Sequence, residues 1–543
     1  MKRFTTLIIL VGLIALNILS LYVSFRLDLT REGKYSLAPA TKQLLSGLSA
    51  AMTVKAYFTN DLPSQLVSIR QYVADVLQEY QAYGGRKLIV QFIDPAGNAD
   101  NEKEAKALGV APVSMQIREA DSLQVKQGYF GMALFYKDKK EAIPLLQDSE
   151  LNNLEYTLTS LMTKMSMEKL PTVGFLHGHG EHDIGFGLPA GMVPQEQNGD
   201  YSVVADELRK HYQVKSIDIG EGDSLDSLSL LVVAGAKKDL SRRDIFEIDQ
   251  YLLKGGKAIF LVDSVSAAPN TINFDVRKTN LQTLFAPWGI SIPNAIVFDR
   301  LAEFGQFSEG PGQIYMVPYP AFIWLVKKNF SQNPIVSKIQ SMVVRFVNPI
   351  EIKPKDGVEA DAFLNSSPDA WVQTSPFSLS PRSVPEPKPG ERAKRTIAVE
   401  LSGLLPRISE ELTPPPLQKW SQNAKHEDVL VAVTEHTDKS RAVVETPKDP
   451  AKVIMMGDSD FATNQLVAND SISLGFFLNM VDSLALSSDL VSIRSKAFSN
   501  VPISGDLSMT QKTTLKLLGI LLVPILLSSF GTIHLILRRK KSS

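Results

Sequence analysis

Residues 228–262 read LSLLVVAGAKKDLSRRDIFEIDQYLLKGGKAIFLV, and this stretch decides the fold class. Leu228–Ala234 is almost continuously apolar, which is typical of a parallel strand covered on both faces. Ser241 can cap a helix that runs to Leu253. The apolar side chains of that helix share one face, at Ile245, Ile248 and Leu252. Lys257–Val262 is the next apolar strand. A strand, a helix and a strand in this order predict an α/β protein with a doubly wound parallel sheet.

The same sheet is expected to include strands on both sides of this stretch. Leu170–His177 and Gln213–Ile219 precede it, and Lys452–Gly457 follows much later in the chain. Leu170–His177 and Lys452–Gly457 are short, mainly apolar segments that are bounded by turn residues, as buried strands are. We therefore expect segments that are distant in sequence to contribute to one sheet.

The doubly wound domain is predicted to comprise residues 169–300 and 431–500. Residues 301–430 show weaker periodicity and are expected to form an insertion. Their Pro-rich segments, of which Ser380–Gly390 is one, have the composition of exposed and partly flexible chain.

Residues 26–168 have the pattern of a second α/β domain. Strand, helix, strand and helix are followed by further strands between Met52 and Leu145. This order resembles the thioredoxin fold, which usually has two cysteines on its first helix. The chain contains no cysteine, so we expect a thioredoxin-like domain with a structural or binding role.

Two long apolar runs lie near the ends of the chain. Residues 4–25 and 517–537 contain no charged side chain, and each is long enough to cross a hydrocarbon core of about 30 Å as a helix. Lys2 and Arg3 precede the first run, and a basic cluster at 538–541 follows the second. Basic flanks favour the cytoplasmic side. These patterns predict two transmembrane helices in a bacterial inner membrane, with cytoplasmic termini and a large periplasmic, extracytoplasmic region. A cleaved signal peptide is the alternative for the first run.

The composition excludes several classes of function. A net charge of −1 over 543 residues argues against a nucleic-acid partner, which would require a basic surface. The absence of cysteine excludes disulfides, thiol nucleophiles and Cys-ligated zinc. No GxxxxGK[ST] pattern occurs, so the chain is not expected to hydrolyse ATP. Gly255 and Gly256 end a helix and are not a dinucleotide fingerprint.

The densest group of polar residues is HGHGEHD, which follows the strand Leu170–His177. Ligands of open α/β sheets bind at the carboxyl ends of the strands, so the segment is a candidate binding loop. One interpretation is a metal site formed by His177, His179 and Asp183. The other is a tight turn or ligand-binding loop without metal, which we favour. The residues of the candidate loop are His177, Gly178, His179, Gly180, Glu181 and His182.

A second motif, GDSD, follows the strand Lys452–Gly457. It is similar to the GDS block of SGNH-type esterases, which need a histidine downstream of the serine. The histidine that follows Ser459 is His534, inside the second apolar run, so a triad of that pattern is not expected. We predict a strand-end turn without catalytic residues, at Gly457, Asp458, Ser459 and Asp460.

Several blocks together resemble the gliding-motility ABC-transporter auxiliary family of the GldG type. They extend over most of the chain and include the two apolar runs with their basic flanks. The other blocks are RLDLTREGKYSLAPAT at 26–41, FIDPAGN at 92–98, FLHGHGEH at 175–182, the segment 228–262 and VIMMGDSDFATN at 453–464.

The resemblance implies a membrane-anchored, non-enzymatic subunit that works with an ABC permease and a separate ATPase. It also implies a glutamine amidotransferase-like or flavodoxin-like middle domain that lacks the nucleophilic cysteine. No cofactor is expected, and the extracytoplasmic region would bind an exported substrate or an envelope protein. Two alternatives remain, a membrane-tethered metal-dependent hydrolase that acts on envelope material and an envelope scaffold without a transporter.

Overall fold

A computed structural model describes most of the central part of the chain. It describes residues 36–486 and Ile493, apart from 61–63, 120–121, 147–150, 152, 186–198, 268–273, 309–312, 338, 354, 378–379, 383, 424, 434–441 and 469. All the described residues belong to the unit that comprises residues 1–498.

No helix among the described residues is both long enough and apolar enough to cross a membrane. This finding contradicts the predicted fold class, which included two transmembrane helices, and the inner-membrane location derived from them. The longest described helix, α3 at Ser64–Gly84, contains Arg70, Asp75 and Glu79, and its apolar residues are needed for the core beneath it. Residues 4–25 and 517–537, on which the prediction was based, lie outside the described residues.

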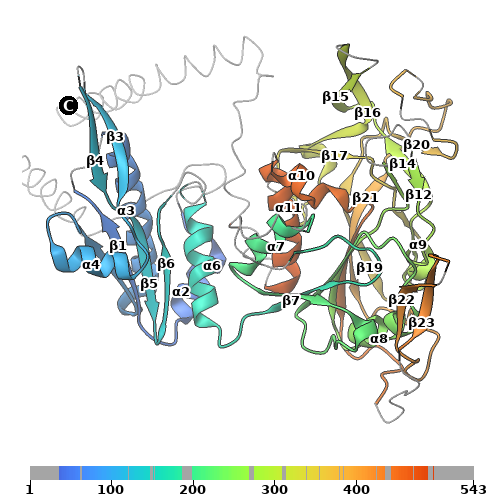
Figure 1. Ribbon diagram of the computed structural model, residues 1–543, viewed down its shortest axis with the longest axis horizontal. Coiled ribbons are helices and arrows are strands. Elements are labelled where there is room, and N and C mark those ends of the chain that lie inside the picture. Colours follow the sequence, from blue (N-terminus) through green and yellow to red (C-terminus); the bar gives the residue numbers. More distant parts are fainter. Residues whose placement is uncertain are drawn as a thin grey trace, which may run out of the picture. The chain divides into compact units, whose positions relative to one another are not determined.

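The first part of the described chain folds around a four-stranded mixed sheet (Figure 1). Its order is β2-β1-β5-β6, in which β1 is parallel to β2 and antiparallel to β5, and β5 is antiparallel to β6. Val54 and Ala56 of β1 face a core built with α3 and α6, whereas Tyr57 faces the opposite core, which includes Ala105 of α4. The strands are β1 Met52–Phe58, β2 Leu88–Ile93, β5 Phe130–Tyr136 and β6 Lys139–Ile143, and the helices are α2 Pro39–Gly47, α3, α4 Ala99–Ala107 and α6 Leu154–Ser166.

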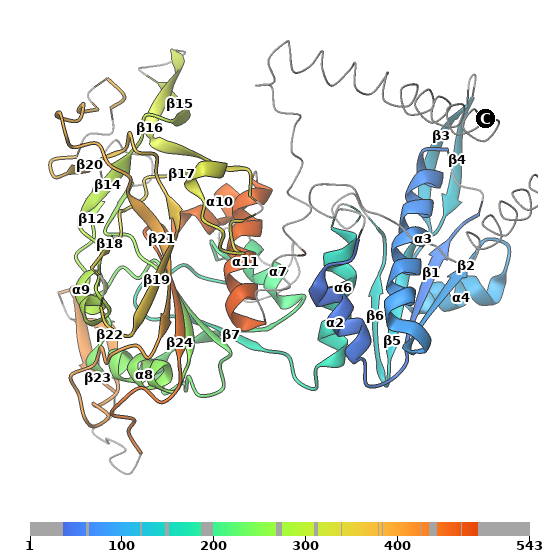
Figure 2. The ribbon, with the colours of Figure 1, turned by 180° about the vertical axis from the view of Figure 1, so that it is seen from behind.

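A seven-stranded sheet dominates the rest of the described chain, with the order β19-β21-β24-β10-β9-β7-β8 (Figures 1 and 2). Five neighbouring strands are parallel, and β21 and β19 add an antiparallel edge. The parallel strands are β7 Thr172–Leu176, β8 Gln213–Ile217, β9 Leu230–Ala234, β10 Lys257–Leu261 and β24 Ala451–Met456. The antiparallel strands β19 Val358–Asn365 and β21 Thr396–Gly403 come from the segment expected to be an insertion, and they extend the sheet.

Both faces of this sheet are buried, because successive side chains of β9 enter different cores. Leu230 and Val232 face the core that includes α7, at Ser202–Arg209, and α11, at Ser471–Ala485. Leu231 and Val233 face the core that includes α8, at Arg242–Leu253. The central strands therefore lie between two layers of helices. Because these strands are parallel, the residues that follow them lie at the same edge of the sheet, the carboxyl edge.

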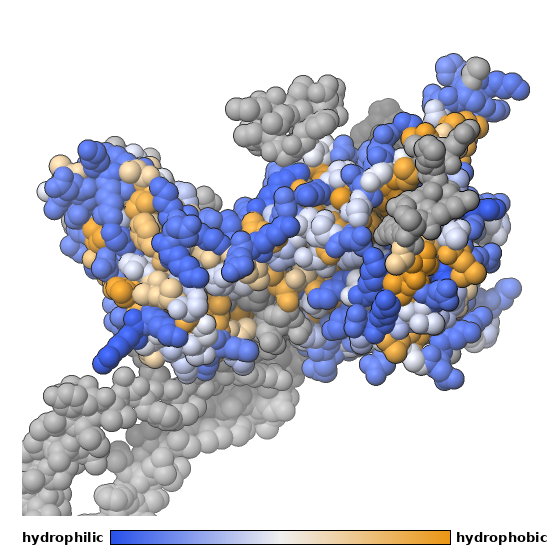
Figure 3. Space-filling model, turned by 90° about the horizontal axis from the view of Figure 1, so that it is seen from below, coloured by the Kyte–Doolittle hydropathy of each residue, from blue (hydrophilic) through white to orange (hydrophobic). Residues whose placement is uncertain are grey.

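Smaller sheets accompany the two main sheets, and the pair of β3 and β4 lies in the first part of the described chain (Figure 1). Figure 3 shows one face of the molecule, on which hydrophilic residues predominate and hydrophobic residues gather in separate patches. The remaining strands pair as β3 Val113–Glu119 with β4 Ser122–Gly128, β11 Val265–Ala267 with β12 Phe274–Val276, β13 Ile290–Ser291 with β18 Glu351–Ile352, β14 Ala295–Phe298 with β20 Trp371–Thr374, β15 Ala302–Ser308 and β17 Ser341–Arg345 with β16 Ile314–Val326, and β22 Gln418–Gln422 with β23 Asp428–Ala432. Two further α-helices are short, α9 Leu281–Leu284 and α10 Asn464–Val467.

Candidate functional site

The loop after β7 is a tight turn tied to the start of α8. Gly178 and Gly180 have φ angles of 115° and 80°, which other residues rarely adopt. Between them, the backbone N–H of His179 donates to Glu181 Oε2 over 2.7 Å. The His179 ring lies 3.0 Å from Glu181 Oε1 through Nδ1 and 3.0 Å from Asp244 Oδ2 through Nε2. The buried His179 ring, hydrogen-bonded to Glu181 and Asp244, therefore holds the loop against the start of α8.

The electrostatics of His179 explain its role. Burial alone lowers the pKa of the imidazole, but the hydrogen bonds and charges of Asp244 and Glu181 outweigh burial and raise the pKa to about 10. Both ring nitrogens then donate to carboxylates, so neither has a lone pair for a metal ion. His179 stabilises the turn and does not act as a ligand.

The structure does not assemble His177, His179 and Asp183 into a metal site. His177 is exposed, and its backbone N–H donates to the Ile217 carbonyl over 2.8 Å. Asp183 is also exposed, and its Oδ1 accepts the backbone N–H of Gly185. Among the described residues, these three do not form a cluster with the spacing of metal ligands.

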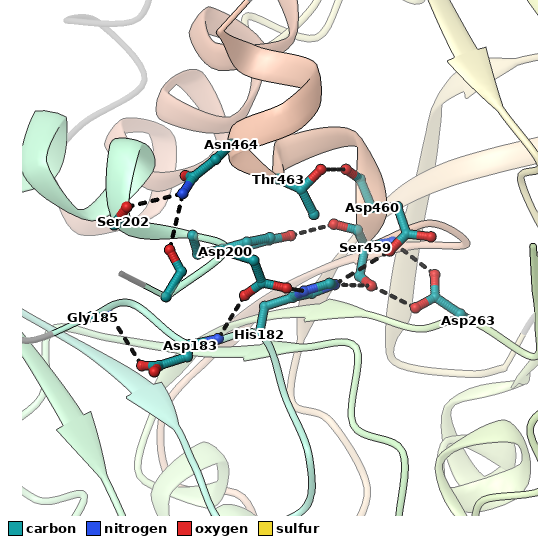
Figure 4. Close-up of polar contacts among 12 residues, drawn as sticks. His182, Asp183, Gly185, Asp200, Ser202, Asp263, Ser459, Asp460, Thr463 and Asn464 are labelled. Atoms are coloured by element: carbon teal, nitrogen blue, oxygen red, sulfur yellow. Dashed lines mark hydrogen bonds and ion pairs between the residues drawn. The ribbon is translucent and has the colours of Figure 1, made fainter. Parts of the chain in front are cut away.

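The remaining histidine of the loop, His182, lies in a different network (Figure 4). Its Nδ1 is 2.5 Å from Asp200 Oδ2, and its Nε2 is 2.8 Å from Ser459 Oγ. The ring stacks on Tyr201, with centroids 4.6 Å apart and an interplanar angle of 4°. Tyr201 in turn donates its hydroxyl to the Ser459 carbonyl. His182 is thus held on its face and at both nitrogens.

Ser459 connects this histidine to a buried acid that follows β10. The Ser459 hydroxyl donates to Asp263 Oδ2 over 2.5 Å, and the Ser459 backbone N–H donates to Asp263 Oδ1 over 2.8 Å. Arg277 forms an ion pair of 2.7 Å with Asp263 Oδ2. His182, Asp263 and Ser459 follow β7, β10 and β24, so the network lies at the carboxyl edge of the parallel sheet, where open α/β folds bind ligands.

Two further aspartates make this edge acidic. Asp458 is fully buried, and burial followed by the charges of Asp460 and Asp263 raises its pKa. Burial and the Asp263 charge also raise the pKa of Asp460, against the opposing effect of His182. For Asp200, burial is outweighed by the hydrogen bond to His182, and the pKa is lowered.

The comparisons with known proteins place the chain in a family. A family described as "ABC-type uncharacterized transport system" matches residues 170–490, which is more than half of the 543 residues. The chain belongs to this ABC transport auxiliary family. All the site residues described above lie within the matched region, and residues 31–135 match a separate domain of unknown function.

The relatives of this family member are distant. An uncharacterized protein of Borreliella burgdorferi is 22% identical over 416 residues, which are 74% of this chain and 76% of the relative. A solved structure of the mmIFT52 N-terminal domain is 12% identical, with a TM-score of 0.33, and the match covers 58% of this chain and 98% of that one. The exo-beta-1,4-mannosidase Op5Man5 of an Opitutaceae bacterium is 11% identical, with a TM-score of 0.22, over 78% of this chain and 51% of the enzyme.

The arrangement Asp200, His182, Ser459 has the order of contacts found in hydrolytic triads, but its hydrogen bonds are oriented differently. In a triad the serine donates to the histidine. Here the single Ser459 proton is donated to Asp263, so it is not donated to His182 Nε2, which lies 2.8 Å from Ser459 Oγ. Ser459 is also completely buried. The site of this family member is therefore not arranged for attack by Ser459 on a substrate.

Sequence reasoning did not identify Asp200 and Asp263 or the contact between His182 and Ser459. The esterase pattern predicts a histidine downstream of Ser459, whereas His182 lies upstream of it, and the order of such residues along a chain varies among folds. Both motifs follow strands predicted to be parallel members of one sheet, and that signal places them at a common edge.

Proposed function

We propose that the chain is an auxiliary subunit of an ABC transport complex and acts by binding. Other subunits, a permease and an ATPase, would transport the cargo and hydrolyse ATP. The family match supports the transport role, and the absence of a Walker A pattern supports the division of labour. The carboxyl edge of the parallel sheet would contact cargo or an envelope partner.

The hydrogen bond from the Ser459 hydroxyl to Asp263 is the observation on which the non-enzymatic part of the proposal rests. It occupies the proton that a nucleophilic serine would have to transfer to His182. The buried residues of the site consequently hold the loops at the carboxyl edge of the sheet in place. The exposed residues His177 and Asp183 form the rim of this edge and can contact another molecule.

We further propose that the subunit belongs to the gliding-motility, GldG-like branch of these auxiliaries. The support is the order of sequence blocks from Arg26–Thr41 to Val453–Asn464. The proposal concerns the relationship of the sequences alone.

Capture of partners from cells tests the transport role. The tagged full chain should co-purify with an ABC permease and an ATPase, as identified by mass spectrometry. Recovery of the chain with neither subunit, under conditions that keep other ABC complexes intact, would overturn the proposal.

Site-specific crosslinking tests the binding edge. A photo-reactive residue at position 177, on the rim, should crosslink to a transporter subunit or to cargo. The same probe at position 46, exposed on α2, is the matched control. Equal crosslinking from both positions would contradict a specific role for the rim.

A further inference from the structure

Three potential ligand atoms converge beside Ser459. His182, Asp263 and Asp460 each offer one donor atom, and these atoms lie within 4.8 Å of one another. His182 Nε2 is 3.5 Å from Asp460 Oδ1. The three residues follow β7, β10 and β24, so adjacent or nearby parallel strands hold them at one edge. This cluster shares no residue with the metal site considered from the sequence, which comprised His177, His179 and Asp183.

The contact between His182 and Asp200 is of the kind that is found at metal-binding histidines. Histidines that bind metal commonly donate the other ring N–H to a carboxylate, which sets the tautomer and the ring orientation. Asp200 accepts from Nδ1 over 2.5 Å and stacking on Tyr201 fixes the ring plane, so Nε2 is directed at the cluster. The position of Asp200 on the far nitrogen is thus a second feature, independent of the spacing of the three donors.

The acids retain capacity for a cation. A carboxylate has about four acceptor positions. Asp263 uses three toward the part of the chain that the structure describes, for the Ser459 backbone, the Ser459 hydroxyl and Arg277, and one position on Oδ1 has no partner among these residues. The Asp460 side chain is 47% exposed, which provides a path for an ion from solvent.

Several carboxylates lie close together at the cluster. Three acidic residues, at 263, 458 and 460, surround the cluster. Arg277 pairs with Asp263, and the charges of His182, Arg277 and Lys237 lower the pKa of Asp460. Carboxylates that are this close repel one another in a buried setting, and a divalent ion relieves that repulsion.

We propose that His182, Asp263 and Asp460 bind a divalent transition-metal ion at the carboxyl edge of the sheet. One imidazole and two carboxylates form a donor set that suits Mn²⁺ or Zn²⁺. His182 would bind the ion through Nε2, because its Nδ1 faces Asp200. The site goes beyond the auxiliary role and does not depend on it.

Metal content of the full chain tests the proposal. Metal ions are removed from the protein with EDTA, and samples are incubated separately with Mn²⁺ and Zn²⁺ and then desalted. Inductively coupled plasma mass spectrometry measures the metal bound per chain. We expect about one equivalent of at least one of the two ions. Asp460→Asn should weaken binding at least tenfold, since it removes a charged ligand while keeping the side-chain size. Asp206→Asn, which removes an exposed acid of α7, should bind as the wild type does.

Spectroscopy identifies the ligand even if one variant fails to fold. Bound Mn²⁺ should show coupling to an imidazole nitrogen in electron spin-echo measurements, and His182→Gln should abolish that coupling. Asp460→Asn, whose side chain is half exposed, provides the folded comparison. Absence of a stoichiometric ion, or equal affinity in Asp460→Asn and the wild type, would overturn the site, and neither result bears on the capture of transporter subunits.

Discussion

At the scale of single residues, His179 determines how the loop after β7 responds to pH. Its neighbours Asp244 and Glu181 raise its pKa from 6.5 to about 10, despite the opposing effect of burial. A folded-state pKa above the unfolded value means that the stabilisation is complete below about pH 6.5 and is lost as pH rises through about 10.

We therefore expect the free energy of unfolding to fall between pH 6.5 and pH 10, by on the order of 2–4 kcal/mol from this residue. Urea denaturation at pH 6, 8 and 10 measures it. His179→Gln removes the titrating group, so the variant should lose most of this dependence. Parallel pH profiles for the wild type and the variant would show that His179 is not responsible.

Gly235 is the second position where one residue determines the site. Its φ is 70°, and a Cβ atom would lie 2.5 Å from Ser459 Oγ and 3.0 Å from the His182 ring. Hydrogen bonds hold Ser459, so it cannot easily move away. Gly235→Ala should lower the free energy of unfolding by about 1–3 kcal/mol.

Thermal and urea unfolding of Gly235→Ala beside Gly47→Ala provide the measurement. A Cβ at Gly47 meets no atom within 4 Å, at the end of α2, so that substitution should be neutral or stabilise by up to about 1 kcal/mol. Similar unfolding midpoints for the two variants would mean that the space around Ser459 is not restricted.

At the scale of elements, α8 begins with a capping box that also supports the loop. Ser241 Oγ accepts the Asp244 N–H over 3.1 Å, and Asp244 Oδ2 accepts the Ser241 N–H over 2.8 Å while contacting His179. Asp244 therefore joins the start of a helix to the turn after a neighbouring strand.

Ser241→Ala should cost about 1 kcal/mol of stability, because one backbone N–H of the first turn loses its acceptor in a buried position. Denaturant unfolding measures the loss. Ser46→Ala, at an exposed serine of α2 whose hydroxyl donates to the Gln43 carbonyl, should change stability by less than about 0.5 kcal/mol. A smaller effect for Ser241→Ala than for Ser46→Ala would argue against the cap.

At the scale of the whole molecule, the sheet depends on its last strand in the sequence. β24 lies between β10 and β21 and pairs with both, and Ile454 and Met455 enter opposite cores. Removal of β24 would expose the edges of two strands and both apolar layers.

A fragment of residues 169–430 should therefore fail to unfold cooperatively, whereas 169–486 should show one cooperative transition. Circular dichroism during heating and limited proteolysis distinguish the two outcomes. A folded, protease-resistant 169–430 fragment would show that the first four parallel strands suffice for this domain.

The sequence allowed the βαβ pattern of 228–262 to be predicted, because both signals are local. The unbroken apolar run of β9 reflects burial of the strand on both faces. Ser241 caps α8 because its side-chain oxygen accepts a backbone N–H of the first turn. The HGHGEHD segment was likewise identifiable as a turn, since closely spaced glycines permit positive φ. The two transmembrane helices were predicted from apolar runs and their basic flanks, and no described helix is long and apolar enough to cross a membrane.

The site itself was decided by tertiary structure. His182 and Ser459 are 277 residues apart, and they meet because β7 and β24 enter one parallel sheet with β9 and β10 between them. Hydrophobic patterns predict that each strand is buried, but they do not encode strand order, which results from packing of the helices on both faces. The sequence alone thus determined which residues end strands, while only the folded sheet decided that His182, Asp263 and Asp460 would share one edge.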